Sequence, residues 1–252
     1  MITLNAVVLC LYPMSLSCCR FYPACLLAAY VFGAASFAQE PDLQIVTESS
    51  PPYQTLLNGE VAGEATDKVK AIIQRAGLTA SYSMFPWARA YKKALTEPNT
   101  LIYALAKTEQ RDALFTWLSP VTQYEFGLVK LSGREDIQLT SIDQIKTYRL
   151  AVQRDDISHQ WMVRNGLIEG EHFITCSDIN CSWQLLLNKN VDLIIETAEL
   201  IEDMLRQNGK SSGSAEFIMP IPELAITGYL ATNHLIAPDL LKKLQQAIAA
   251  QP

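Results

Sequence analysis

The chain has 252 residues, 49% of them hydrophobic, which is enough to bury the core of one or two domains. Its formal net charge is −6 and it contains no run of basic residues, so its composition argues against nucleic acid as a partner. After residue 40, no stretch is long and apolar enough to form a membrane-spanning helix.

The first 38 residues have the pattern of a secretory signal peptide. They contain no Asp or Glu and one basic residue, Arg20, which is followed by the apolar run ACLLAAYVFGAA. Small residues, Ser36 and Ala38, then stand at the −3 and −1 positions of a cut before Gln39. We expect residues 1–38 to be removed on export to the periplasm; an uncleaved membrane anchor is the alternative.

The exported part begins with a strand at residues 43–47 and a loop that contains two adjacent prolines. Thr66 is expected to cap a helix, because the next apolar residues recur at helical spacing until Gly77. A strand at 80–85 precedes a helix that begins at Pro86, and Trp87 is assigned to the apolar stripe of that helix. Further strands are predicted at 101–105 and 126–131.

The second part of the chain continues the alternation of strands and helices. Strands are predicted at 149–153, 173–175, 191–195, 217–221 and 225–230, and helices at 141–145, 157–165, 182–187, 198–207 and 238–248. This alternation indicates an α/β fold with helices on both faces of the sheets.

Two cysteines, Cys176 and Cys181, lie outside the expected signal peptide. A close pair in an oxidising compartment predicts a disulfide, and two free buried thiols are the alternative. No metal site is expected, because His159, His172 and His234 do not stand at ligand spacing from the cysteines.

Four segments occur in the order found in the family 3 solute-binding proteins, the extracellular amino-acid receptors of ABC importers. They are SSPPY, GEVAGEATDKVKAIIQRAG, TEQRDALFTWLSP and SIDQIKTYRLAVQ. The resemblance covers most of residues 43–250. It implies the type II periplasmic-binding-protein fold, in which two lobes, each a mixed sheet flanked by helices, are joined by two crossing strands. Lobe one would comprise residues 39–128 and 222–252, and lobe two residues 129–221, with the ligand held between them beyond the carboxyl ends of the strands.

The resemblance assigns a role to Arg111, which matches the Arg of the family's Thr-x-x-Arg motif. In the family this Arg grips the α-carboxylate of the ligand, for which the guanidinium fork is well suited. The alternative is a surface charge paired with Glu109 or Asp112.

Two further residues become candidates through the resemblance. Tyr53 stands where the family often stacks an aromatic ring on its ligand, although it could equally pack within its own loop. Arg89 lies in the first turn of a helix that would border the cleft.

The strand before Arg111 departs from the pattern of amino-acid receptors. Tyr103, Ala104 and Ala106 stand where small hydroxyl residues are usual, so Ala106 is expected to offer the ligand mainly backbone groups.

Two departures in the second lobe concern charge. The helix that usually begins with Gly-Thr or Gly-Ser here follows Asp155 and Asp156, and two acids would repel a carboxylate. Thr197 stands near the position of the family's ammonium-binding Asp, with Glu196 beside it. We therefore expect Glu196, or Asp155 and Asp156, to face any cationic part of the ligand.

The sequence contains no serine-nucleophile motif, phosphate loop or dinucleotide-binding glycines, so we expect a binding protein without a cofactor. The expected partners are a small polar, amino-acid-like ligand and the permease of an ABC importer, and the protein is expected to be a monomer. One alternative is a secreted dehydratase resembling cyclohexadienyl dehydratase, for which Glu196 could transfer a proton. Another is a protein that presents its ligand to a membrane sensor.

Overall fold

The computed structural model describes residues 40–250, so the expected signal peptide lies outside the described residues. Within this part of the chain, no helix combines the length and the apolar character needed to cross a membrane.

Eight strands form one mixed sheet in the order β4-β1-β5-β10-β6-β9-β7-β8. β1 runs parallel to β4 and β5, and β7 runs parallel to β8 and β9, whereas the central β6 and β10 are antiparallel to each other. The strands are β1 (Leu43–Thr47), β4 (Ala80–Met84), β5 (Thr100–Ala106), β6 (Thr116–Leu131), β7 (Leu150–Gln153), β8 (Phe173–Cys176), β9 (Leu193–Thr197) and β10 (Ala215–Thr232).

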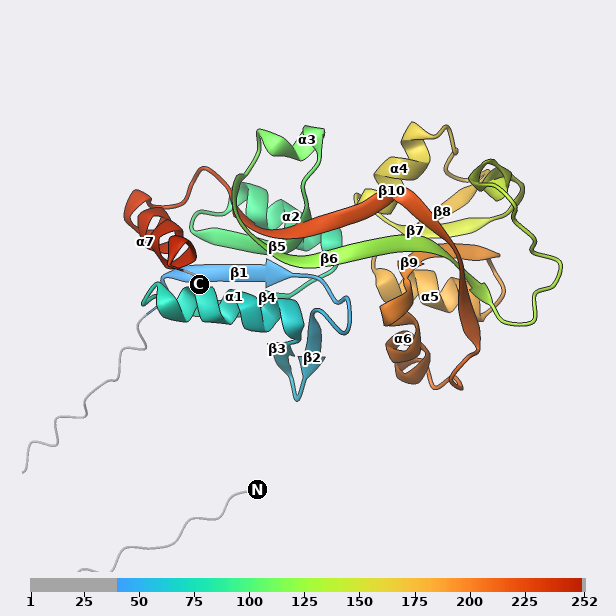
Figure 1. Ribbon diagram of the computed structural model, residues 1–252, viewed down its shortest axis with the longest axis horizontal. Coiled ribbons are helices and arrows are strands. Elements are labelled where there is room, and N and C mark those ends of the chain that lie inside the picture. Colours follow the sequence, from blue (N-terminus) through green and yellow to red (C-terminus); the bar gives the residue numbers. More distant parts are fainter. Residues whose placement is uncertain (1–39, 251–252) are drawn as a thin grey trace, which may run out of the picture. The chain divides into compact units, whose positions relative to one another are not determined.

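The long strands β6 and β10 connect two groups of elements (Figure 1). β10 pairs with β5 near its carboxyl end, and β6 pairs with β9 further along its own length. We call the elements around β4-β1-β5 the first half and those around β9-β7-β8 the second half. The predicted α/β class is therefore confirmed, with the two predicted sheets joined into one by the crossing strands.

Helices cover both faces of the first half. α1 (Glu64–Arg75) and α7 (Pro238–Ala249) pack on the face that carries Leu43 and Ile45 of β1, while α2 (Trp87–Thr96) packs on the face that carries Val46. Alternate strand residues point to opposite faces, so one short apolar strand contributes to both cores.

The second half repeats this arrangement. α4 (Ile157–Arg164) packs against Leu150 and Val152 of β7, whereas α5 (Ile179–Leu187) and α6 (Ile201–Gln207) pack on the opposite face, against Ala151. The remaining elements are the hairpin β2 (Thr55–Leu57) and β3 (Glu60–Ala62), the short helix α3 (Glu109–Asp112), and the 3₁₀ turns η1 (Ile142–Thr147) and η2 (Ala198–Leu200).

The bounds of the two crossing strands were predicted wrongly. β6 begins at Thr116 rather than at residue 126, and β10 is one strand where two were predicted. Pro120 and Pro220 lie inside these strands, and proline normally interrupts a sheet because it lacks an N–H donor. Here the pairing shifts register beside each proline, and both strands continue.

The start of α1 was also predicted wrongly. The helix follows Gly63, and Thr66 is a buried residue within it whose hydroxyl lies 2.8 Å from that of Tyr103. Gly63 has φ 114°, and a Cβ there would lie 2.5 Å from the Tyr53 carbonyl oxygen, so glycine is required where the hairpin joins the helix.

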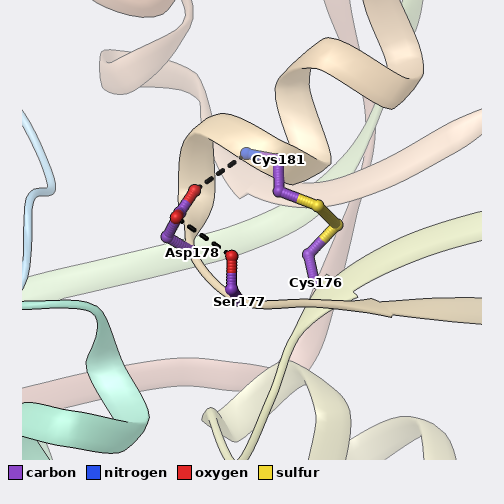
Figure 2. Close-up of a disulfide and its surroundings, with 4 residues drawn as sticks. All are labelled: Cys176, Ser177, Asp178 and Cys181. Atoms are coloured by element: carbon purple, nitrogen blue, oxygen red, sulfur yellow. Dashed lines mark hydrogen bonds between the residues drawn. A yellow bond between two sulfur atoms is a disulfide. The ribbon is translucent and has the colours of Figure 1, made fainter.

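The predicted disulfide between Cys176 and Cys181 is confirmed (Figure 2). It joins the end of β8 to the first turn of α5. Asp178, the residue that caps α5, accepts hydrogen bonds from the Cys181 N–H at 2.9 Å and from the Ser177 hydroxyl at 3.1 Å. The covalent bond and the cap together fix the loop between strand and helix.

Replacing both Cys176 and Cys181 by Ala should lower the free energy of unfolding by about 2 kcal/mol, because the short cross-linked loop loses its constraint on the unfolded chain. For a chain of this size that corresponds to a fall in Tm of about 4–8 °C, measured by calorimetry. The exposed Ser177→Ala serves as the control. Equal melting temperatures for the double variant and the parent would contradict the prediction.

Candidate functional site

A small, partly open cavity lies where the parallel strands of both halves end. Glu48 directly follows β1, Ala106 ends β5, Gln153 ends β7, and Glu196 lies one residue before the end of β9; all four line the cavity. Ligand sites in open α/β sheets are expected at this edge. The cavity volume is about 40 Å³, which is room for a few water molecules.

A larger cavity of about 430 Å³ lies next to the first and shares four lining residues with it. We call the small cavity the inner chamber and the large one the outer chamber. The shared residues are Glu48, Ser49, Gln153 and Ile179. The other residues of the outer chamber are Thr55, Leu56, Met84, Phe85, Pro86, Asp178, Asn180 and Gln207, so both halves contribute to it.

Arg111 lines the inner chamber and is only 2% exposed. Its Nη1 donates to the carbonyl of Ala106 at 3.3 Å, and its Nη2 donates to the carbonyl of Asp155 at 3.0 Å. Asp155 belongs to the second half, so the guanidinium joins the two halves directly.

The surroundings of Arg111 are aromatic. Its guanidinium carbon lies 5.3 Å from the ring centre of Trp87 and 5.1 Å from that of Tyr91, within the range of cation–π attraction. Burial lowers the pKa of Arg111, although Tyr91 and the nearby acids oppose this. Asp112 pairs with Lys107 at 3.0 Å. The alternative that Arg111 is a surface charge is therefore wrong.

The turn before α4 presents a carbonyl group to the first half. Asp155 has φ 60°, a left-handed conformation that is uncommon for residues other than glycine. Its carbonyl oxygen accepts a hydrogen bond from Trp87 Nε1 at 2.9 Å as well as from Arg111. Asp156 then caps α4 by accepting from the His159 N–H at 2.6 Å. Because the helix is capped by its own carboxylate, it offers little to an anionic ligand.

Three carboxyl groups, those of Glu48, Asp156 and Glu196, line the inner chamber. Burial raises the pKa of Glu48 to about 8, and repulsion by Asp156 adds to the rise. Burial likewise raises the pKa of Asp156 to about 7, although the His159 N–H and Arg111 oppose it. Burial, Asp156 and Glu48 raise the pKa of Glu196 well above its usual value.

Two acceptor atoms at the inner chamber have no hydrogen-bond donor. Within residues 40–250, Glu48 Oε2 and Gln153 Oε1 are buried without a partner. No group of three or more His, Cys, Asp or Glu side chains that could hold a metal ion was found among residues 40–250. The rings of Tyr124 and Phe126, with centres 5.3 Å apart, complete the wall. A donor of the chamber, Arg111 Nε, is likewise buried without a partner in this range. The chamber therefore offers two unpaired acceptors and one unpaired donor.

The structure brings together four of the six residues singled out in the sequence. Arg111, Ala106, Asp156 and Glu196 all line the inner chamber.

The other two, Tyr53 and Arg89, are not among the described residues that line either chamber. Tyr53 packs edge-on against Tyr124, with ring centres 5.1 Å apart, so it supports the chamber wall from behind. The exposed Arg89 lies over the ring of Phe85, 4.5 Å from its centre.

Sequence reasoning missed several lining residues. Glu48 and Gln153 directly follow or end predicted strands, so the rule that places ligands at carboxyl ends could have identified both. Trp87 was assigned to the core, and it is indeed 4% exposed, but it also lines the chamber. Tyr124 lies in the part of β6 that was not predicted as a strand, and Phe126 is the first residue of the strand that was predicted.

No protein-family model and no curated protein matches the sequence. Several solved structures match the fold. A histidine kinase sensor domain with similarity to periplasmic binding proteins has a TM-score of 0.70 and 16% identity, over 82% of this chain and 88% of that chain.

Two binding proteins match equally broadly. Holo ArgBP from T. maritima has a TM-score of 0.67 and 15% identity, over 82% of this chain and 88% of that chain. The substrate binding protein of an amino acid ABC transporter has a TM-score of 0.67 and 13% identity, over 82% of this chain and 91% of that chain. This chain has the type II periplasmic binding fold. Identities this low establish the fold alone.

The raised pKa values predict that the empty protein loses stability as the pH rises from about 5 to about 8. In the unfolded chain the carboxyls titrate near 3.8 for Asp and 4.5 for Glu. Below these values both states are protonated and the contribution to stability is complete; it is lost as the pH rises through the folded-state pKa of about 8 for Glu48. Melting temperatures measured across this range should therefore fall.

A double variant, Glu48→Gln with Glu196→Gln, is the control, because amides remain neutral at every pH. The melting temperature of this variant should change less with pH than that of the parent. A melting temperature of the parent that rises over the same range would contradict this description of the chamber.

Proposed function

We propose that this chain is a periplasmic solute-binding protein that closes its two lobes on a small polar ligand and delivers it to an ABC importer. The supporting observation is the chamber between the halves, in which two buried acceptor atoms lack donors. Unpartnered buried polar groups are costly, so a ligand that satisfies them gains binding energy.

Ligand entry requires the halves to separate. The inner chamber is too small to admit an amino-acid-sized molecule, and the hydrogen bonds that Arg111 and Trp87 donate to the Asp155 carbonyl hold the two halves together beside it. We propose that residues 39–128 with 222–252, and residues 129–221, move as the two lobes. A ligand that binds mainly the closed form shifts the population toward it.

Export through a cleaved signal peptide places this activity in the periplasm. The disulfide supports that location, because such bonds persist in oxidising compartments. The permease remains the proposed membrane partner, and genes for a permease and an ATPase beside this one would distinguish transport from presentation to a sensor.

A thermal-shift screen of small polar metabolites should find compounds that raise the melting temperature by several degrees and are recovered unchanged. A compound present at about 100 times its Kd stabilises the folded state by about 2.7 kcal/mol. Steady consumption of the compound would instead support the dehydratase alternative, in which the carboxyl of Glu196 transfers a proton.

Two variants test whether the ligand binds in the inner chamber. Ala106→Leu should fill the inner chamber and abolish the thermal shift, whereas Ala113→Leu, at an exposed position after α3, should not. An undiminished shift for Ala106→Leu would move the site elsewhere and overturn the proposal.

A further inference from the structure

We propose that the ligand is a linear amine with at least two cationic groups and no carboxylate. One cationic end would occupy the inner chamber and the rest of the molecule the outer chamber. This inference rests on the proposed function and specifies the chemistry of the ligand at that site.

The charge of the inner chamber favours a cation. Three carboxyls line it, and Arg111 is the only Lys, Arg or His among the described residues of its wall. Both Nη atoms of Arg111 already donate to the carbonyls of Ala106 and Asp155. These two contacts use two of the five N–H donors of the guanidinium, and a ligand carboxylate that reached the others would still face three acids. The guanidinium is thus already partly engaged by the protein's own backbone.

The hydrogen-bonding groups of the chamber also favour a cation. Gln153 is 8% exposed and its Oε1 has no partner within residues 40–250; Glu48 Oε2 is in the same situation. Glu196 is 6% exposed. An ammonium group carries three donors and no acceptor, which complements such a wall. The faces of aromatic rings attract cations, and Tyr124 and Phe126 line the same space.

The two volumes favour a long, narrow molecule. The inner chamber, of about 40 Å³, has room for a head group, whereas the outer chamber offers about 430 Å³. No Lys, Arg or His occurs among the described residues that line the outer chamber, and its second half contributes Asp178. Leu56, Met84 and Phe85 provide apolar surface for methylene groups. Asp178 would therefore receive the second cationic end in addition to the hydrogen bonds that it accepts from the Cys181 N–H and the Ser177 hydroxyl.

The test compares amines with the amino acids from which they differ by one carboxylate. Cadaverine is paired with lysine, and agmatine with arginine, and each is titrated calorimetrically into the exported chain at neutral pH. Each amine should bind at least tenfold more tightly than its amino acid. Equal or tighter binding of the amino acids, or no binding of either amine, would overturn the inference.

Conservative variants test whether the carboxyls of the inner chamber bind the amine. Glu196→Gln and Glu48→Gln should each weaken cadaverine binding about tenfold, as expected for the loss of a hydrogen bond to a charged group. Glu199→Gln, an exposed acid three residues from Glu196, should bind as the parent does. Melting curves verify that each variant folds. Unchanged affinity in both chamber variants would contradict the assignment.

The outer chamber has its own test. Asp178→Asn keeps a residue that can cap α5, and it should weaken cadaverine more than pentylamine, which has a single cationic end. Equal losses of affinity for the two amines would contradict the assignment of Asp178 to the second cationic end.

The proposed function can fail or stand independently of this inference. If lysine and arginine bind but the amines do not, and Ala106→Leu abolishes their binding, the solute-binding role stands and only the ligand class is wrong. If ligands bind regardless of Ala106→Leu, the proposed site itself is wrong.

Discussion

The hydrogen bond from Arg111 to the Asp155 carbonyl is the contact on which the arrangement of the site depends. It connects the two halves across the chamber, and it is possible only because Asp155 adopts a left-handed conformation that turns its carbonyl toward the first half. Such a conformation costs free energy for a residue with a side chain, so it has to be held by its surroundings. Trp87 provides that support by donating to the same oxygen and by packing beside the guanidinium.

Burial of the three carboxyls Glu48, Asp156 and Glu196 is the second constraint on the site. Their burial raises their pKa values, which lowers the cost of holding them away from water. Arg111 offsets part of this cost without forming an ion pair with them. With their pKa values raised, these carboxyls hold protons near neutral pH that the proposed cationic ligand would displace.

Much of the fold follows from the sequence, because the short parallel strands and their covering helices have clear apolar periodicity. The bounds of the crossing strands could not be predicted, because prolines and register shifts interrupt the apolar periodicity of β6 and β10. At the site, Arg111, Asp156 and Glu196 were found through motif positions. The partner of Arg111 could not be predicted, because a backbone carbonyl has no residue type that marks it. Glu48 could have been found, since it directly follows the first strand.

Proton release on ligand binding tests the central claim, that a cation binds among carboxyls kept partly protonated by burial. Agmatine is fully charged at neutral pH, so any proton released comes from the protein. Calorimetry in two buffers with different ionisation enthalpies measures that number directly. The account predicts net release near pH 7, reduced in the Glu48→Gln and Glu196→Gln variants. Proton uptake, or heats that do not depend on the buffer, would contradict it.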